Sequence, residues 1–196
     1  MSNNNKTVQK LWNLSNILRD DGVNFSQYVN ELTHILFLKM TKETDTEDQL
    51  PEPYRWDVLY NESGLKQLSY YKQLLLDLGK STFTKHVDGK ETEYMVTPLV
   101  QSIYENAQTF LRQPANLNKL IEEINKLDWY SAREEGLGDL YEGLLERNAS
   151  ETKSGAGQYF TPRPLIDAIV DVSKPQAGEV ISDPASGTLG FLICAD

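Results

Sequence analysis

The sequence predicts a mainly helical protein whose last part is the beginning of an α/β domain. Apolar residues recur at helical spacing through most of the first 150 residues. A polar, glycine-rich stretch, Asn148–Pro164, interrupts this pattern. A helix, a turn, a short strand, a glycine-rich loop and the start of another helix follow, which is the order that opens an α/β sheet. We therefore expect a helical bundle domain over residues 1–150 and an incomplete α/β domain over residues 151–196.

Six segments of the helical domain have apolar side chains on one helical face, and they span residues 8–18, 25–39, 65–78, 98–111, 117–127 and 137–145. Asp20–Gly22 ends the first segment, and Ser26 is a candidate N-cap of the second. Gly79 is expected as the C-terminal cap of the third, because glycine is common just after a helix. Pro98 suits the first turn of the fourth.

Two connections in this domain have no helical pattern. Leu50–Leu59 contains two prolines and is expected to be a loop. Residues 81–92 are polar and fit either short strands or an irregular excursion. Several aromatic side chains occupy apolar helical positions and are expected in the core: Trp12, Tyr28, Tyr71, Trp129 and Tyr141.

In the second domain, a helix is expected to start just after Pro164, with Leu165, Ile166, Ile169 and Val170 as its apolar stripe. Residues 174–179 are expected to form a turn. Residues 179–182 follow as a short strand that ends before Pro184.

Charge limits the classes of function. The chain has 196 residues with 19 Lys and Arg against 29 Asp and Glu, a net charge of −10. Because nucleic-acid affinity depends on neutralising phosphates, this balance argues against a stand-alone nucleic-acid binder. Either the chain does not contact nucleic acid or a partner supplies most of the positive surface.

Targeting and metal signals are weak. No apolar run reaches the roughly 18 to 20 residues that span a bilayer, and Met1–Lys6 lacks a signal-peptide core, so we expect a cytoplasmic protein without membrane contact. Cys194 is the single cysteine, which excludes an internal disulfide, and its apolar neighbours predict burial. His34 and His86 are isolated, so no metal site is expected.

The loop Asp183–Gly190 has features of a ligand site. Gly187 and Gly190 allow a tight turn close to a ligand, and the following helix start offers free N–H groups. The loop lacks the Gly-Lys-Ser/Thr of phosphate loops and the third glycine of the dinucleotide fingerprint. Its first carboxylate, Asp183, suits a ligand with ammonium or hydroxyl groups, such as S-adenosylmethionine. An ordinary strand-to-helix turn is the alternative.

A second element lies about 25 residues upstream, at Gly155–Pro162. Tyr159 and Phe160 offer aromatic faces, and Thr161 offers a hydroxyl group. Pro162 and Pro164 fix the start of a helix. Taken alone, this element is also compatible with a plain loop.

Together the two elements, GQYFTP (157–162) and DPASGTLGFL (183–192), resemble the cofactor-binding motifs of adenine-N6 DNA methyltransferases. Further matching stretches are QYVNEL (27–32), LFLKM (36–40), YRWD (54–57), LDWY (127–130) and the long block at 138–165. The whole chain thereby resembles the modification (M) subunit of type I restriction-modification systems.

The resemblance implies a helical N-terminal domain followed by a Rossmann-like, S-adenosylmethionine-dependent methyltransferase domain. It implies cofactor contacts from Gln158, Tyr159, Phe160, Thr161, Pro162, Arg163, Asp183, Gly187, Thr188, Leu189 and Gly190. Position 189 is usually Gly or Ala in the family, so Leu189 departs from the pattern and adds bulk beside the cofactor. The implied partners are DNA, a specificity (S) subunit, a second methyltransferase subunit and a restriction (R) subunit.

The catalytic motif of this family, Asn/Asp-Pro-Pro-Phe/Tyr, binds the flipped adenine. No Pro-Pro occurs in the chain. We therefore expect a fragment that has no catalytic residue of its own and does not methylate DNA alone. Two alternatives stay open: a helical interaction or scaffold module with a vestigial cofactor loop, and a methyltransferase for protein, RNA or a small molecule.

Overall fold

The computed structural model describes residues 9–14, 17–18, 21–87, 89–127, 129, 161, 163–186 and 189–195. The chain divides into two compact units, residues 1–148 and 149–196, and each is described by itself. This division falls among residues outside the described ranges, so the expected boundary near residue 150 stays a prediction. The expected helix 137–145 and Tyr141 also lie outside those ranges.

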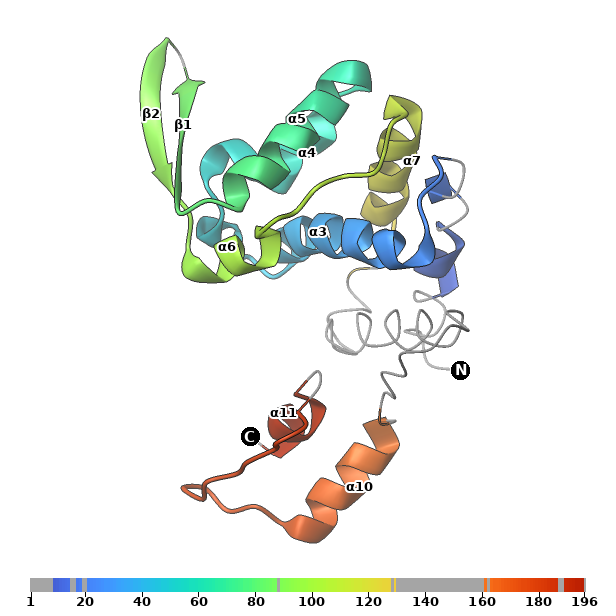
Figure 1. Ribbon diagram of the computed structural model, residues 1–196, viewed down its shortest axis with the longest axis vertical. Coiled ribbons are helices and arrows are strands. Elements are labelled where there is room, and N and C mark those ends of the chain that lie inside the picture. The colour runs from blue at the N-terminus through green and yellow to red at the C-terminus, as the bar shows by residue number, and fades with distance from the viewer. Residues whose placement is uncertain are drawn as a thin grey trace. The chain divides into compact units, whose positions relative to one another are not determined.

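The first unit is mainly helical, as predicted (Figure 1). Its described helices and strands are α3 (Phe25–Glu43), η1 (Glu47–Gln49), η2 (Glu52–Tyr54), α4 (Trp56–Asn61), α5 (Gly64–Leu78), β1 (Thr82–Val87), β2 (Lys90–Met95), α6 (Pro98–Tyr104) and α7 (Pro114–Asn125). Residues 9–13 and 17–18 are helical as well. No helix in the described part of the chain is long and apolar enough to cross a membrane.

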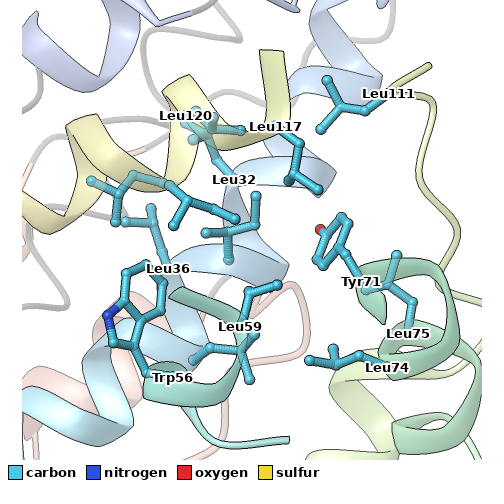
Figure 2. Close-up of a cluster of buried hydrophobic side chains, with 14 of the residues drawn as sticks. Leu32, Leu36, Trp56, Leu59, Tyr71, Leu74, Leu75, Leu111, Leu117 and Leu120 are labelled. Carbon is cyan, nitrogen blue, oxygen red and sulfur yellow. The ribbon is translucent and has the colours of Figure 1, made fainter. Parts of the chain in front are cut away.

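The α3 helix runs through the centre of the core. Its N-cap is Asn24, not Ser26 as expected, because the Asn24 side chain accepts the Gln27 N–H while Gln27 accepts the Asn24 N–H, both at 3.0 Å. Figure 2 shows Leu32 and Leu36 of α3 between the apolar side chains of α7 and those of α4 and α5. This packing explains why α3 keeps an apolar stripe along its length.

The expected aromatic core is present. Trp12, Tyr28, Tyr71 and Trp129 are all buried in the apolar cluster of the first unit. The Tyr71 ring lies among the side chains of α5 in Figure 2. These residues are therefore structural, as predicted.

The segment Leu50–Leu59 is not the plain loop that its two prolines indicated. It contains η2 and the first turns of α4, and Trp56 and Leu59 are buried there. Pro53 lies within η2. Proline is compatible with the first residues of a short helix. The two prolines therefore do not prevent helix formation in this segment, and α4 begins after them at Trp56.

Residues 81–95 form an antiparallel hairpin, one of the two structures that the sequence left open. The register pairs Thr82 with Met95 and Val87 with Lys90. Phe83 is buried and stacks on Tyr94 with ring centres 5.3 Å apart. The hairpin extends away from the helices in Figure 1.

The expected helix over 98–111 ends early. Pro98 begins α6 as predicted, but the helix stops at Tyr104 and residues 107–113 have no regular secondary structure. Asn106 adopts φ 58°, which breaks the helix. Leu111 is nonetheless buried, so its apolar spacing reflects packing of an extended segment.

The second unit contains α10 (Arg163–Ser173) and α11 (Gly190–Ala195). The helix after Pro164 and the turn at 174–179 are confirmed, although Leu165 and Ile169 are exposed while Ile166 is buried. Residues 179–182 are not a strand. A strand needs a neighbour for its backbone hydrogen bonds, and the described part of this unit offers none.

Candidate functional site

The loop before α11 is held by two local hydrogen bonds. The Asp183 carboxylate accepts the Ala185 N–H at 3.0 Å through Oδ1. The Ser186 carbonyl accepts the Leu189 N–H at 2.7 Å. The loop thus begins with a turn at a carboxylate, as the sequence predicted, and the Asp183 residue is half-buried.

Leu189 is the residue with the most unusual backbone in this loop. Its φ is 65°, in the left-handed region that favours glycine. Its side chain is 47% exposed, and its carbonyl accepts the Ile193 N–H at 2.9 Å at the start of α11. The site therefore imposes a glycine-like backbone on a leucine.

Gly190 brings the loop against α10. A Cβ atom at this position would lie 2.9 Å from Cδ1 of Ile166. A Cβ atom here would make the end of the Ile166 side chain shift, so the glycine lets the loop approach α10 without that adjustment. Ile166 is one turn into α10, so this contact links the loop to the helix that follows the Gln158–Arg163 element.

The predicted cofactor residues are described only in part. Thr161 is half-buried, and Arg163 is the first residue of α10. Gln158, Tyr159, Phe160, Pro162, Gly187 and Thr188 lie outside the described residues. The structure therefore places Asp183 and Leu189 in one loop and Gly190 against α10, and the assignment of all eleven residues to a cofactor stays a prediction.

The expected burial of Cys194 is wrong. The side chain is partly exposed, and its Sγ lies 3.4 Å from Oδ1 of Asp167 on α10. The apolar run around it predicted burial, but α11 has only α10 to pack against among the described residues of its unit.

Lys39 is a buried cation of α3 for which the sequence pattern indicated no role, although the residue lies in the apolar spacing of residues 25–39. The side chain pairs with Glu43 at 2.5 Å. The ammonium nitrogen lies 5.2 and 5.9 Å from the ring centres of Trp56 and Trp129. These cation–π contacts connect α3 with α4 through Trp56, and α3 with Trp129.

Neither histidine takes part in a site. His34 is buried and stacks on Tyr104 with ring centres 5.3 Å apart, whereas His86 is exposed on β1. Within the described ranges, no group of three or more His, Cys, Asp or Glu side chains is arranged to hold a metal ion.

Comparison with known protein families agrees with this arrangement. A family model described as the HsdM N-terminal domain matches residues 7–155, and one described as N-6 DNA Methylase matches residues 132–196. The first covers the helical unit, and the second covers the loop and both helices of the second unit. The chain belongs to the family of type I restriction enzyme methylase subunits.

Individual type I methylase subunits match the whole chain. The StySPI methylase subunit of Salmonella potsdam is 51% identical over 99% of this chain, which spans 35% of that subunit's length. The crystal structure of the EcoKI M protein has 39% identity and a TM-score of 0.53, with 97% of this chain and 31% of that one covered.

A structure from a study of complex assembly and conformational transition of the type I R-M system has a TM-score of 0.65 at 25% identity. It covers all of this chain and 41% of that one. The chain thus matches the N-terminal part of these methylase subunits, and the predicted mainly helical fold followed by part of a methyltransferase domain is confirmed.

Proposed function

We propose that the protein containing this chain transfers a methyl group from S-adenosylmethionine to N6 of adenine in DNA. The observation that carries the proposal is the 51% identity to a type I methylase subunit over 99% of the chain. The proposal concerns a longer protein, because the chain spans 35% of that relative's length.

The described loop is compatible with the cofactor. One oxygen of Asp183 accepts the Ala185 N–H, and Oδ2 has no hydrogen bond among the described residues. This oxygen would accept a hydrogen bond from the ammonium group of S-adenosylmethionine, directly or through water. The absence of a side chain at Gly190 keeps the turn close to α10 and leaves its backbone accessible.

The other cofactor contacts follow the family motif. The bound cofactor would supply an activated methyl group on its sulfonium. The backbone of the turn at Gly187, Thr188, Leu189 and Gly190 would hold the methionine moiety. The segment Gln158–Arg163 would close over the cofactor and exclude water.

The chain alone is proposed to be inactive. Adenine-N6 transfer needs a motif that accepts hydrogen bonds from the adenine amino group and stacks on the base, and no Pro-Pro of such a motif occurs in residues 1–196. Adenine should be methylated only by the longer protein. The activity is proposed to be cytoplasmic, as the resemblance to the type I modification subunits implies.

The partners are proposed from the same family. DNA, a specificity subunit, a second methylase subunit and a restriction subunit would form the working complex. Support comes from the net charge of −10, which leaves other subunits to supply most of the positive surface around DNA. The helical unit would contact partners and surround the duplex without reading bases.

Calorimetric titration of the chain with S-adenosylmethionine tests the cofactor site. Asp183→Ala should weaken binding at least about tenfold, since an ionic hydrogen bond contributes about 1.5–3 kcal/mol. Asp171→Ala is the matched control, because Asp171 is exposed on α10. Equal binding by both variants would remove Asp183 from the site.

DNA methylation is the second test. The chain alone should transfer no methyl group to duplex DNA, and the longer protein with its specificity subunit should yield N6-methyladenine by mass spectrometry. Methylation by the chain alone would contradict the proposal that the chain lacks the catalytic motif. Absence of cofactor binding in both proteins would favour the scaffold alternative.

A further inference from the structure

The first unit has a pocket that the proposed activity does not use. It has a volume of about 450 Å³ and lies between the N-terminal segment around residues 10–17 and the C-terminal half of α7. Figure 1 shows this segment, in blue, beside α7. Leu14 and Ile17, each 8% exposed, and Leu127 form its apolar part.

Lysines surround this apolar part. Lys10, Lys119 and Lys126 line the pocket with a single carboxylate, Glu123, which leaves a local charge of +2. Lys126 pairs with Glu123 at 3.2 Å and with Glu122 at 3.9 Å. Lys10 and Lys119 have no ion-pair partner among the described residues. A chain with a net charge of −10 thus places two available cations at one pocket.

We propose that this pocket docks an acidic segment of a protein partner that inserts one apolar side chain. The apolar side chain would cover Leu14 and Ile17, and flanking carboxylates would bind Lys10 and Lys119. Burial of the apolar group would supply affinity, and the lysines would supply orientation and specificity.

The lining favours an acidic peptide over nucleic acid. A sugar–phosphate backbone would satisfy the lysines, but it has no apolar group to cover Leu14, Ile17 and Leu127. The volume lies within the range of pockets that enclose ligand groups.

The inference is independent of cofactor binding, and it can be tested on the chain itself. The probe is a short glutamate-rich peptide with one central phenylalanine, titrated into the isotope-labelled chain and followed by NMR. Resonances of Lys10, Leu14 and Lys119 should shift. The same peptide with alanine in place of phenylalanine should bind at least about tenfold more weakly, because it loses most of its apolar area.

Charge reversal supplies the matched comparison. Lys10→Glu/Lys119→Glu should weaken peptide binding about tenfold or more, because it replaces two attractions with two repulsions. Lys72→Glu/Lys90→Glu makes the same change in net charge at exposed lysines of α5 and β2, and it should retain binding within about twofold. Unchanged thermal unfolding of both variants confirms that the fold is kept.

Two results would overturn the proposal. Equal loss of peptide binding in both double variants would show that the peptide responds to the net charge of the chain and not to this pocket. Tighter binding of a DNA duplex than of the peptide, lost in Lys10→Glu/Lys119→Glu alone, would assign the pocket to nucleic acid. Failure of cofactor binding in the same chain would affect the proposed function and leave this inference standing.

Discussion

Two buried carboxylates, Asp21 and Glu31, hold the irregular segment that follows α6. Glu31 accepts the Phe110 N–H at 2.6 Å and the Tyr71 hydroxyl at 3.2 Å. Asp21 accepts the N–H groups of Arg112 and Gln113 at 3.2 and 3.3 Å. Because residues 107–113 have no secondary structure, these side chains replace the backbone partners of a regular element.

Glu31→Ala should therefore destabilise the protein by about 2–4 kcal/mol. The substitution leaves the buried Phe110 N–H and Tyr71 hydroxyl without an acceptor. Glu31→Gln retains an acceptor and should cost about 1 kcal/mol. Urea unfolding measures both, with Glu93→Ala on exposed β2 as the control. A Glu31→Ala variant as stable as the control would show that other groups hold the segment.

Burial makes His34 a pH-dependent residue. Desolvation lowers its pKa from 6.5 to about 4, although a hydrogen bond to the Ile103 backbone opposes the shift. The unfolded state therefore binds the proton more readily. The stabilising effect of neutral His34 is complete above pH 6.5 and is lost as the pH falls toward 4.

Between about pH 7.5 and pH 5, this linkage should remove about 2 kcal/mol of unfolding free energy. His34→Gln should lack that loss, while His86→Gln, at an exposed position, should keep it. Unfolding by urea at several pH values measures the difference between each variant and the wild type. A constant difference for His34→Gln would mean that His34 is protonated in the folded state as readily as in the unfolded one.

Substitution of Leu189 tests whether the turn before α11 is strained. At φ 65°, a residue with a Cβ atom pays about 1 kcal/mol relative to glycine. Leu189→Gly should thus be about 1 kcal/mol more stable locally than Leu189→Ala, although both lose the leucine side chain. The Ile193 amide, bonded to the Leu189 carbonyl, should exchange about fivefold more slowly in the glycine variant. Equal exchange rates in the two variants would indicate that the backbone at position 189 is not strained by a Cβ atom.

At the scale of single residues, the sequence predicted the burial of side chains whose chemical type determines their environment. The buried aromatics Trp12, Tyr28 and Tyr71 are examples, since large apolar rings have few stable places outside a core. The roles of Asp21 and Glu31 could not be predicted. A carboxylate that binds a backbone about 80 residues away in sequence has no local signal, and it looks like any polar residue of a helix surface.

At the scale of the elements, the C-terminal end of α5 packs closely against the end of α6. Gly79 caps it as predicted, but for another reason than a left-handed turn, because its φ is −77°. A Cβ atom there would lie 2.6 Å from the carbonyl oxygen of Tyr104 in α6. The glycine thus allows α5 and the end of α6 to meet.

Gly79→Ala should destabilise the protein by about 2–3 kcal/mol, since a backbone carbonyl must move to accept the methyl group. Ser81→Ala changes a nearby exposed side chain and should cost less than about 0.5 kcal/mol. The urea midpoints of the two variants make the comparison. Similar midpoints would show that α6 adjusts freely.

Periodicity predicted the positions of α3, α5, α7 and α10. The first three each bury an apolar stripe, whereas α10 buries only Ile166 of its expected stripe among the described residues. It overextended α6, since Ala107, Phe110 and Leu111 have helical spacing but pack from an extended backbone. Short elements such as α4 depend on tertiary packing of Trp56, which no local pattern shows.

At the scale of the molecule, the two units differ in how much apolar surface they bury. The first unit encloses a continuous core. In the second, Val172, Val180 and Ile193 are 83%, 97% and 60% exposed. The turn that begins at Asp183 could be predicted from sequence. The expected strand at 179–182 is absent from the described residues, because a parallel strand is stabilised by its neighbours.

Hydrogen exchange should separate the units. Amides in α3 and α5 should be the most protected. Val180 and Ile181 should exchange close to the unprotected rate, because both are exposed and neither has a strand partner among the described residues. In a protein as long as the methylase relatives, the same two amides should become protected by at least about a hundredfold, as neighbouring strands of the methyltransferase sheet bond to them. Protection of Val180 and Ile181 in the 196-residue chain would contradict the exposed conformation. Continued fast exchange in the longer protein would show that 179–182 is not a strand of that sheet, and the proposed position of Asp183 at the end of a strand would then have to be abandoned.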